Sequence, residues 1–526
     1  MLPAASIRSV QIELRFLPLQ PDYIRQTFER LGQLGYNTVY LQYEDTFPFR
    51  RHRTLRGSFT YSRAQVRQIN QWAKDNGLQI IPLTYSFSHS DQLLQRPQYA
   101  DLAESDAKAS LCLTHPRSID LMAELAEDVL ELHPESKFIH IGGDEIQQLI
   151  ACPRCTTAMC QHGRSGVLVN FLNKVARRFR QLGVRPAIWS DMLIRYPQAI
   201  DNLSRDLLIF YWDYWSHGER QPFLTIGGGF SDMFILDKKA ITGDLAVMTH
   251  FPLTRPLEEL PQGLATVYRD YWKLDRKQTS AKSFPYLQFF TDHRFDVIGS
   301  ALPYVELGSI LPNVQEKWSH LTHAVKRIHE TGAAGGTLCH WAPFWPPLET
   351  LWLGITAFSE GLQHNHRAMA PEKILPRYTT LTLGQDAPDF ANAVWNASRR
   401  FELGDIFNPT WQIVPPEKKI QWHRDAGMVA REHATVNKLS ARLPGHQKCF
   451  RKYAVKQAHA RLFEVLSQEM KLKLKYEKRL LKELPIQTSL RKKMRALRPE
   501  LQKVWSVYYV PSAVKKLTEL RLDPYC

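Results

Sequence analysis

The sequence lacks the marks of a membrane protein and of a small disulfide-stabilised protein. Among its 526 residues there is no apolar run of the roughly 18 residues that a membrane-spanning helix needs. The segment Met1–Arg8 shows no charged stretch followed by an apolar run, so we expect no signal peptide. Only seven cysteines occur, and an odd number spread over a long chain is typical of a reducing compartment. We therefore expect a cytoplasmic protein without a membrane partner.

A glycine-rich phosphate turn is also missing. The first predicted strand, Val10–Leu14, runs into Arg15-Phe-Leu-Pro-Leu-Gln-Pro21, which has none of the glycines that hold a dinucleotide phosphate. This absence argues against an open doubly wound sheet, and we expect no cofactor.

An excess of positive charge is absent except near the end of the chain, since residues 1–416 hold 42 basic and 42 acidic residues. Residues 417–526 hold 26 Lys and Arg but 10 Asp and Glu, so they alone account for the net charge of +16. Such a surface can bind nucleic acid or another anionic partner. Solvated helical faces explain the same composition. We favour the second interpretation and expect no nucleic-acid partner, because no glycine-rich or aromatic-interleaved basic motif accompanies the charge.

Helical and strand patterns alternate over residues 1–360. Each predicted helix is followed by Gly or Pro and then by a short apolar run, which is typical of buried parallel strands. Eight such runs occur, at Val10–Leu14, Thr38–Tyr43, Leu78–Thr84, Phe138–Ile141, Pro186–Trp189, Leu207–Trp212, Val297–Leu302 and Gly336–Trp341. The pattern predicts an α/β fold, a (β/α)8 TIM barrel, with an irregular insertion at Gly218–Gln288.

Strand patterns end near residue 365. Glu417–Leu443, Gln447–Glu483 and Ser489–Leu520 have helical patterns, which Pro444-Gly445 and Pro485 interrupt. We predict a basic helical domain over residues 365–526. Because no low-complexity segment occurs, this domain should be folded.

Carboxylates, histidines and aromatic residues follow most of the predicted strands. The active site of a (β/α)8 barrel lies at the carboxyl ends of its strands. Carboxylates can hold sugar hydroxyls, and aromatic faces can pack on sugar rings, so this rim is typical of a carbohydrate site. The candidate residues are Glu44, Asp45, His89, His140, Asp144, Glu145, Trp189, Asp191, Tyr211, Trp212, Tyr214 and Trp341.

Asp144 and Glu145 are the most specific of these candidates. Gly142 and Gly143 before them allow a turn without Cβ clashes. Two neighbouring carboxylates raise one pKa, so that one group can donate a proton while the other stays ionised. The alternative is a helix N-terminus, where acidic side chains favour the helix dipole. Their position on the rim favours the catalytic interpretation.

The segment His140-Ile-Gly-Gly-Asp-Glu145 resembles the signature of family-20 glycoside hydrolases, the β-N-acetylhexosaminidases. Leu41–Phe49 and Ile81–His89 are similar to the second and third strands of the hexosaminidase D subgroup. The resemblance covers residues 8–350. It implies a retaining exo-hydrolase that removes terminal N-acetylglucosamine or N-acetylgalactosamine from an oligosaccharide or glycoconjugate. In that mechanism the substrate's own acetamido group forms an oxazolinium intermediate.

The resemblance also implies roles for single residues. Glu145 would protonate the glycosidic oxygen and then act as base toward water. Asp144 would orient the acetamido group and stabilise its positive charge. Tyr211 or Tyr214 would hydrogen-bond the acetamido oxygen. The pocket would be walled by Trp189, Trp341 and either Trp212 or Trp215.

The remaining candidates have two interpretations each. His89 and His140 could form a polar layer behind Glu145, or they could be satisfied core histidines. Glu44 and Asp45 could bind sugar hydroxyls, or they could pair with a structural arginine, Arg51 or Arg53.

Two features of the sequence depart from the pattern of the family. Trp341-Ala-Pro-Phe344 lacks the glutamate of the usual Trp-x-Glu, and Arg15 is a loose counterpart of the hydroxyl-binding arginine.

A group of potential metal ligands follows the Asp-Glu pair. Cys152-Pro-Arg-Cys155, Cys160 and His162 could hold zinc and brace the loop after the fourth strand. The spacing departs from that of standard zinc sites, and a redox pair or free thiols fit equally well. We favour the absence of a metal, above all of a catalytic one.

Two classes of function therefore compete. One is an N-acetylhexosaminidase, and the other is a catalytically weak carbohydrate-binding or scaffold protein whose basic helical domain binds a partner. The intact Asp144-Glu145 pair favours the enzyme.

Overall fold

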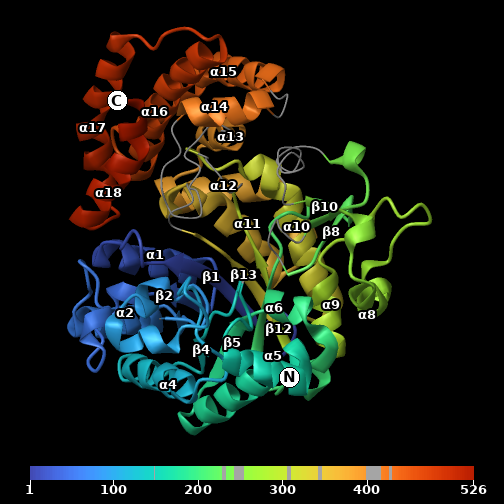
Figure 1. The fold of residues 1–526 in the computed structure, drawn as a ribbon. Helices are drawn as coiled ribbons and strands as arrows, with labels where there is room; N and C mark the ends of the chain where they lie inside the picture. The colour runs from blue at the N-terminus through green and yellow to red at the C-terminus, as the bar shows by residue number, and fades with distance from the viewer. Residues whose placement is uncertain are drawn as a thin grey trace. The chain divides into compact units, whose positions relative to one another are not determined.

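The structure is a computed structural model of the chain. It describes residues 1–83, 85–146, 148–227, 233–241, 254–304, 310–341, 346–397, 416–425 and 429–526. The chain forms two compact units (Figure 1). The first consists of Met1–Arg15, Leu31–Ala301 and His323–Cys339, and the second of Phe16–Arg30, Leu302–Thr322 and His340–Cys526. The second unit therefore includes segments that precede residue 365.

A closed barrel of parallel strands is the centre of the first unit, in the order β1-β13-β12-β6-β5-β4-β3-β2. Its strands are β1 Ile7–Glu13, β2 Thr38–Gln42, β3 Gln79–Leu83, β4 Phe138–His140, β5 Arg185–Trp189, β6 Leu208–Trp212, β12 Asp296–Ala301 and β13 Gly335–Leu338. Each of them overlaps one of the eight predicted strands. The predicted (β/α)8 barrel is confirmed.

Helices connect consecutive barrel strands. They are α1 Pro21–Gln33, α2 Arg63–Asp75, α3 Asp91–Leu94, α4 Pro116–Leu130, α5 Pro153–Gln181, α6 Asp191–Arg195, α8 Gln262–Trp272, α9 Pro285–Asp292 and α10 Val314–Thr331. Helix α2 begins with a capping box, in which Ser62 and Gln65 each accept a hydrogen bond from the other's backbone N–H. Gly77 lies shortly after this helix with φ +68°, a conformation that glycine adopts without a Cβ penalty.

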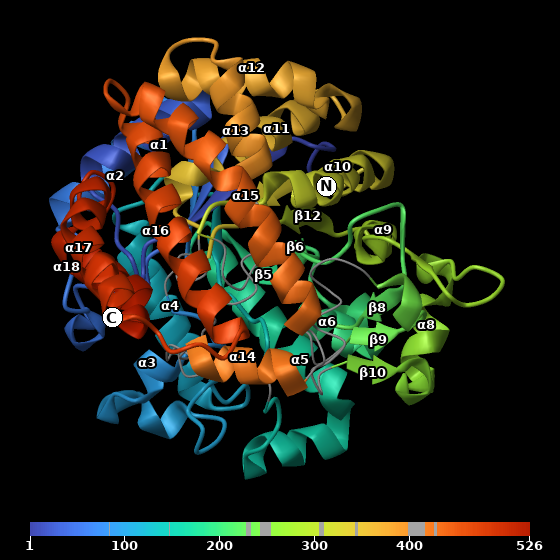
Figure 2. The ribbon, with the colours of Figure 1, turned by 90° about the horizontal axis from the view of Figure 1, so that it is seen from above.

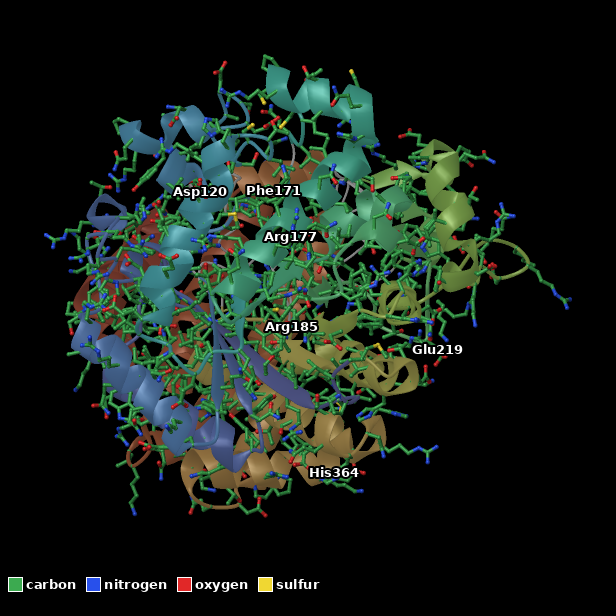
Figure 3. All side chains as sticks on the ribbon, turned by 90° about the horizontal axis from the view of Figure 1, so that it is seen from below. Asp120, Phe171, Arg177, Arg185, Glu219 and His364 are labelled. Carbon is green, nitrogen blue, oxygen red and sulfur yellow. The ribbon has the colours of Figure 1, made fainter. Side chains whose placement is uncertain are left out.

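Helix α5 illustrates how the outer helices are divided into two faces. Phe171 is buried, whereas Arg177 is exposed, and both are labelled in Figure 3.

At the amino ends of the strands, the Arg185 guanidinium donates to a carboxylate oxygen of Asp296 at 2.7 Å, which ties β5 to β12. Catalysis in such barrels takes place at the opposite, carboxyl ends.

The segment predicted to be irregular contains two small sheets. Strands β8 Phe223–Thr225, β9 Met233–Ile235 and β10 Thr254–Pro256 form one, and β7 Arg220–Gln221 and β11 Ala281–Lys282 form the other. Together with α8 and α9, they make up the connection from β6 to β12.

The second unit is helical over its carboxyl-terminal part (Figure 2). Its helices there are α11 Trp352–Gln363, α12 Pro371–Leu383, α13 Pro388–Ala397, α14 Pro416–Asp425, α15 Val429–Ala454, α16 Ala458–Leu481, α17 Thr488–Trp505 and α18 Pro511–Leu522. The described residues beyond 346 include no β-strand, and the predicted helical character is confirmed.

The predicted break at Pro444-Gly445 is wrong, because α15 continues through both residues to Ala454. A proline inside a helix removes one backbone hydrogen bond and costs about 3 kcal/mol. Burial on both sides of Pro444 offsets that cost. Leu443 and Phe450 are buried, and the Phe450 ring lies 5.3 Å from the Phe463 ring of α16, which packs beside α15 in Figure 2.

Membrane-spanning helices were not expected from the sequence. Across the described ranges, no helix combines the length and apolar composition needed to cross a bilayer.

Candidate active site

Aromatic rings from four strands fill the interior of the barrel. The ring of His140 on β4 lies 4.7 Å from Tyr40 of β2, 4.8 Å from Trp189 of β5 and 4.9 Å from Phe210 of β6. Strands β2 and β6 lie on opposite sides of the barrel, so side chains from both can meet only inside it. The four rings form the floor beneath the carboxyl ends of the strands.

His140 and Trp189 therefore contribute to this floor rather than to an open surface. Each is only 2% exposed. Burial lowers the pKa of His140 to about 3, so its ring is neutral. His140 Nδ1 accepts a hydrogen bond from the N–H of Gly142 at 3.0 Å. His140 thus supports the loop that carries the carboxylates. The predicted place of Trp189 in the acetamido pocket stays a prediction.

Gly142 and Gly143 bring the loop after β4 close to the loop after β3. Both have positive φ, +67° and +95°. A Cβ on Gly142 would lie 2.0 Å from the Ser86 hydroxyl oxygen, and one on Gly143 would lie 2.6 Å from the ring of Phe87. The N–H of Gly143 donates to the hydroxyls of Ser86 and Ser88 at 3.1 and 3.0 Å. Only glycine allows this close approach.

The helix-cap alternative for Asp144 and Glu145 is wrong. Both residues lie in a loop, and the next helix, α5, begins at Pro153. Glu145 has φ +51°, which is outside the helical region. A left-handed conformation costs a non-glycine residue about 1 kcal/mol or more, so surrounding contacts must maintain it.

His89 lies between the two carboxylates. Its Nε2 is 3.6 Å from an oxygen of Asp144 and 3.4 Å from an oxygen of Glu145. The hydroxyl of Ser88 donates to the other oxygen of Asp144 at 3.1 Å. The side chains of Asp144 and Glu145 are 20% and 48% exposed, so both can reach a ligand in solvent. One cation and two carboxylates therefore form the reactive face of the site.

Asp191 holds the backbone of Glu145 in place. This aspartate begins α6, is 1% exposed, and accepts a hydrogen bond from the Glu145 N–H at 2.7 Å. Burial, together with the negative charges of Asp144 and Glu145, raises the pKa of Asp191 well above its ordinary value. Asp191 was expected to touch substrate. Its burial makes it a positioning residue instead.

The charges around His89 determine where the site holds its proton. Burial lowers the pKa of His89, but the charge of Asp144 and the hydrogen bond to Glu145 outweigh that effect and raise the pKa to about 9. Burial raises the pKa of Glu145, but the hydrogen bond and charge of His89 bring it below its ordinary value. In the ligand-free site the shared proton therefore resides on His89.

Glu44 forms an ion pair, but not with the arginines expected. It is 5% exposed and accepts hydrogen bonds at 2.8 Å from Arg15 and from the amide of Gln42. Arg51 pairs instead with Glu127 at 2.7 Å, so its predicted pairing with Glu44 is wrong. Sugar contacts by Glu44 stay a prediction.

Asp45, the neighbour of Glu44, shapes the loop after β2. Its carbonyl oxygen accepts from the Gly57 N–H at 2.7 Å, and a Cβ on Gly57 would lie 2.1 Å from its carboxylate. The contact of Asp45 with a sugar hydroxyl stays a prediction.

Tyr211 and Tyr214 differ in the direction of their side chains. Phe210 faces the barrel interior, and successive side chains of a strand point to opposite sides, so Tyr211 faces outward. Its ring contacts Tyr286 of α9 at 5.6 Å. This orientation removes Tyr211 from the candidates for acetamido binding. Trp212 shares the inner side with Phe210, and its ring lies 5.1 Å from Tyr214, so Trp212 and Tyr214 remain candidates.

Asp213 is a contributor that sequence reasoning missed. Its carboxylate accepts from the N–H groups of Trp215 and Ser216, both at 3.0 Å, and from the Tyr211 hydroxyl at 3.2 Å. These bonds fix the turn that carries Trp212 and Tyr214. The sequence could have indicated this turn, because an aspartate directly after a strand commonly accepts a hydrogen bond from the backbone N–H two residues further on.

Trp341 belongs to the second unit. Its backbone N–H donates to the Tyr304 hydroxyl at 3.0 Å. Its place in a pocket wall stays a prediction. The expected departure at Ala342–Phe344 lies outside the described residues.

Comparisons with known proteins agree with the resemblance found in the sequence. Residues 38–227 match the family model described as "Glycosyl hydrolase family 20, catalytic domain". Hexosaminidase D of Homo sapiens is 29% identical over 219 residues, which are 40% of this chain and 45% of that protein. Hexosaminidase D of Bos taurus is 29% identical over 204 residues, which are 38% of this chain and 58% of that protein. The chain thus spans about half the length of these curated relatives.

Solved structures with a similar fold include a chitobiase of Flavobacterium johnsoniae, at 13% identity and a TM-score of 0.49, covering 98% of this chain and 78% of that one. Dispersin B follows at 15% identity and a TM-score of 0.40, covering 70% of this chain and 98% of that one.

Proposed function

We propose that the chain is a retaining exo-β-N-acetylhexosaminidase, because residues 38–227 match the family-20 glycoside hydrolase catalytic-domain model and the chain is similar to hexosaminidase D. It would remove terminal N-acetylglucosamine or N-acetylgalactosamine from a glycan. The observation that carries this proposal is the arrangement of Asp144, Glu145 and His89 at the mouth of the barrel.

The first step would form an intermediate from the substrate alone. The acetamido carbonyl oxygen attacks the anomeric carbon, the glycosidic bond breaks, and Glu145 gives a proton to the departing oxygen. The positive charge that develops on the acetamido group needs an anion nearby. Asp144 supplies it, because Ser88 occupies one of its oxygens and leaves the other toward the substrate and His89.

His89 would provide the proton that Glu145 delivers. A bound sugar excludes water from Glu145 and raises its pKa, so the proton moves from His89 Nε2 to the nearby Glu145 oxygen, 3.4 Å away. In the second step, water attacks the anomeric carbon, Glu145 takes the proton of that water, and the acetamido group is restored. Trp212 would pack on the acetamido group and Tyr214 would hydrogen-bond its oxygen; their rings lie 5.1 Å apart.

We extend the proposal to a cytoplasmic location. All seven cysteines lie in the described part of the chain, and none of them is in a disulfide, which supports a reducing compartment.

The test is hydrolysis of para-nitrophenyl N-acetyl-β-glucosaminide and N-acetyl-β-galactosaminide by the full chain. Asp144→Asn should lower kcat by about 100-fold or more, because the amide cannot balance the developing charge. Glu135→Gln is the matched control, since Glu135 is 58% exposed and pairs with Lys74. A thiazoline analogue of the intermediate should inhibit competitively. Absence of turnover of both substrates by the wild type would refute the proposal.

A further inference from the structure

A second cluster of reactive side chains lies apart from the carboxylate pair. Glu104 and Cys112 lie in the connection from β3 to α4, whereas Cys152 and Cys155 lie at the start of α5, after β4. The four side chains place one ligand atom each within 4.8 Å of all the others. Two separate loops of the barrel therefore meet at this cluster.

The spacing of these atoms fits a tetrahedral metal ion. Cys112 Sγ lies 3.4 Å from Cys152 Sγ and 3.6 Å from Cys155 Sγ, and Cys155 Sγ lies 3.1 Å from a Glu104 oxygen. Zinc bonds of about 2.3 Å to sulfur and about 2.1 Å to oxygen place tetrahedral ligands roughly 3.6 to 3.8 Å apart, so small shifts of these side chains would admit the ion. The sulfur atoms are too far apart for a disulfide, whose bond is about 2.05 Å.

We propose that Cys112, Cys152, Cys155 and Glu104 bind a structural zinc ion. Three thiolates and one carboxylate complete a closed tetrahedral set, which leaves no position for a substrate. Glu104, Cys112 and Cys155 are at most 2% exposed. Of the four ligands considered from the sequence, Cys152 and Cys155 belong to the cluster, whereas Cys160 and His162 are exposed on α5 and do not.

Neighbouring groups already orient the ligands. One oxygen of Glu104 accepts from the N–H groups of Ala151 and Cys152, at 2.6 and 3.0 Å, so its other oxygen faces the sulfur atoms. The N–H of Cys155 donates to Cys152 Sγ at 3.3 Å, which holds this sulfur in position. These bonds set the positions of the ligand atoms without the ion.

The ion would join the two loops that build the reactive face. Ser88 and His89 lie on the same β3–α4 connection as Cys112, and Asp144 and Glu145 lie just before Cys152. The contacts between these loops at the face include the Ser88–Asp144 hydrogen bond and the His89–Glu145 pair. A metal that fixes both loops would therefore maintain the positions of the two carboxylates relative to His89.

Metal analysis of the purified full-length protein tests this inference without any activity measurement. The protein is dialysed against excess ZnCl2, and unbound metal is then removed. Inductively coupled plasma mass spectrometry should find about one zinc per chain in the wild type. Cys112→Ala and Glu104→Gln should each lose most of it. Cys160→Ala should retain the wild-type amount, because Cys160 is exposed and outside the cluster.

Cobalt binding by the wild type tests the inference even if the variants do not fold. The chelator-treated protein, with its helical circular dichroism retained, should acquire sulfur-to-cobalt charge-transfer absorption with CoCl2, and ZnCl2 should abolish it. A folded wild type that retains no zinc and shows no such absorption would overturn the inference. So would a pair of these cysteines found oxidised to a disulfide by intact mass. Zinc binding without hydrolase activity would refute only the proposed function.

Discussion

Replacing His89 by glutamine tests how the site holds its proton. In the wild type, one proton is shared by His89 and Glu145, and the pKa of about 9 for His89 means that the pair keeps it to mildly alkaline pH. Glutamine keeps a hydrogen-bond donor near Glu145 but cannot carry the proton. Glu145 must then hold the proton alone, and carboxyl groups release it several pH units lower.

The size of the effect follows from the charges. The two partners lie 3.4 Å apart and are 43% and 48% exposed, so solvent screens their attraction to about 1 to 2 kcal/mol. Loss of His89 removes the hydrogen bond and the charge that hold the pKa of Glu145 below its ordinary value, so that pKa rises. We therefore expect the alkaline limb of kcat/KM to move from about pH 9 in the wild type to a clearly lower pH in His89→Gln, because a carboxyl group alone releases its proton at lower pH than His89 does.

The assay is the dependence of kcat/KM on pH for the para-nitrophenyl substrates, with unfolding monitored at each pH. His364→Gln is the control, because this histidine is 63% exposed and belongs to the second unit (Figure 3). An alkaline limb that stays in place in His89→Gln, with only a uniform loss of rate, would refute the proposed proton sharing.

Three further predictions concern the supports of the site and the second unit. Asp191→Asn should keep most activity because the amide oxygen can still accept the hydrogen bond from the Glu145 N–H, whereas Asp191→Ala removes the acceptor and should lower kcat about tenfold or more; equal losses in kinetic assays would contradict this. Gly142→Ala should lower the free energy of urea unfolding by about 1 to 2 kcal/mol or more, since its φ is +67° and Ser86 blocks the Cβ; an unchanged midpoint would contradict it. Burial raises the pKa of Glu349, but Arg30 and His459 outweigh it and lower the pKa from 4.5 to about 2, so this group's stabilisation is complete above pH 4.5 and lost as pH falls toward 2. This stabilisation amounts to about 3 kcal/mol of unfolding free energy. In Glu349→Gln the free energy of unfolding should therefore depend less on pH between about 4.5 and 2.

The barrel was predictable because its signals are local. Short apolar runs mark all eight strands, several of them shortly after a helix-ending glycine, and Gly-Gly-Asp-Glu follows the fourth of them directly. The carboxylate pair could be placed at the mouth for the same reason: the end of a parallel strand determines where the next residues lie.

The partners of these residues depend on distant contacts. Cys112 and Glu104 lie about 40 residues before the Cys-x-x-Cys pair in the sequence, and the meeting of two loops is visible only in the folded chain. Arg15 lies 29 residues before Glu44 in the sequence, yet it is this arginine, and not the nearby Arg51, that pairs with Glu44.

Orientation was the other unpredictable feature. A fully apolar run such as that of β6 does not show which side chains face inward, so Tyr211 and Tyr214 were equivalent from the sequence. The packing of Phe210 against His140 distinguishes them.

The most direct test of the central claim is to vary the leaving group for the wild type and Glu145→Gln. If Glu145 protonates the departing oxygen, the variant should lose about 100-fold or more on a methyl glycoside, which needs that proton. It should lose far less on a dinitrophenyl glycoside of the same sugar, whose leaving group departs without protonation. Equal losses on the two substrates, or an unaffected methyl glycoside, would contradict the assignment of Glu145 as the acid.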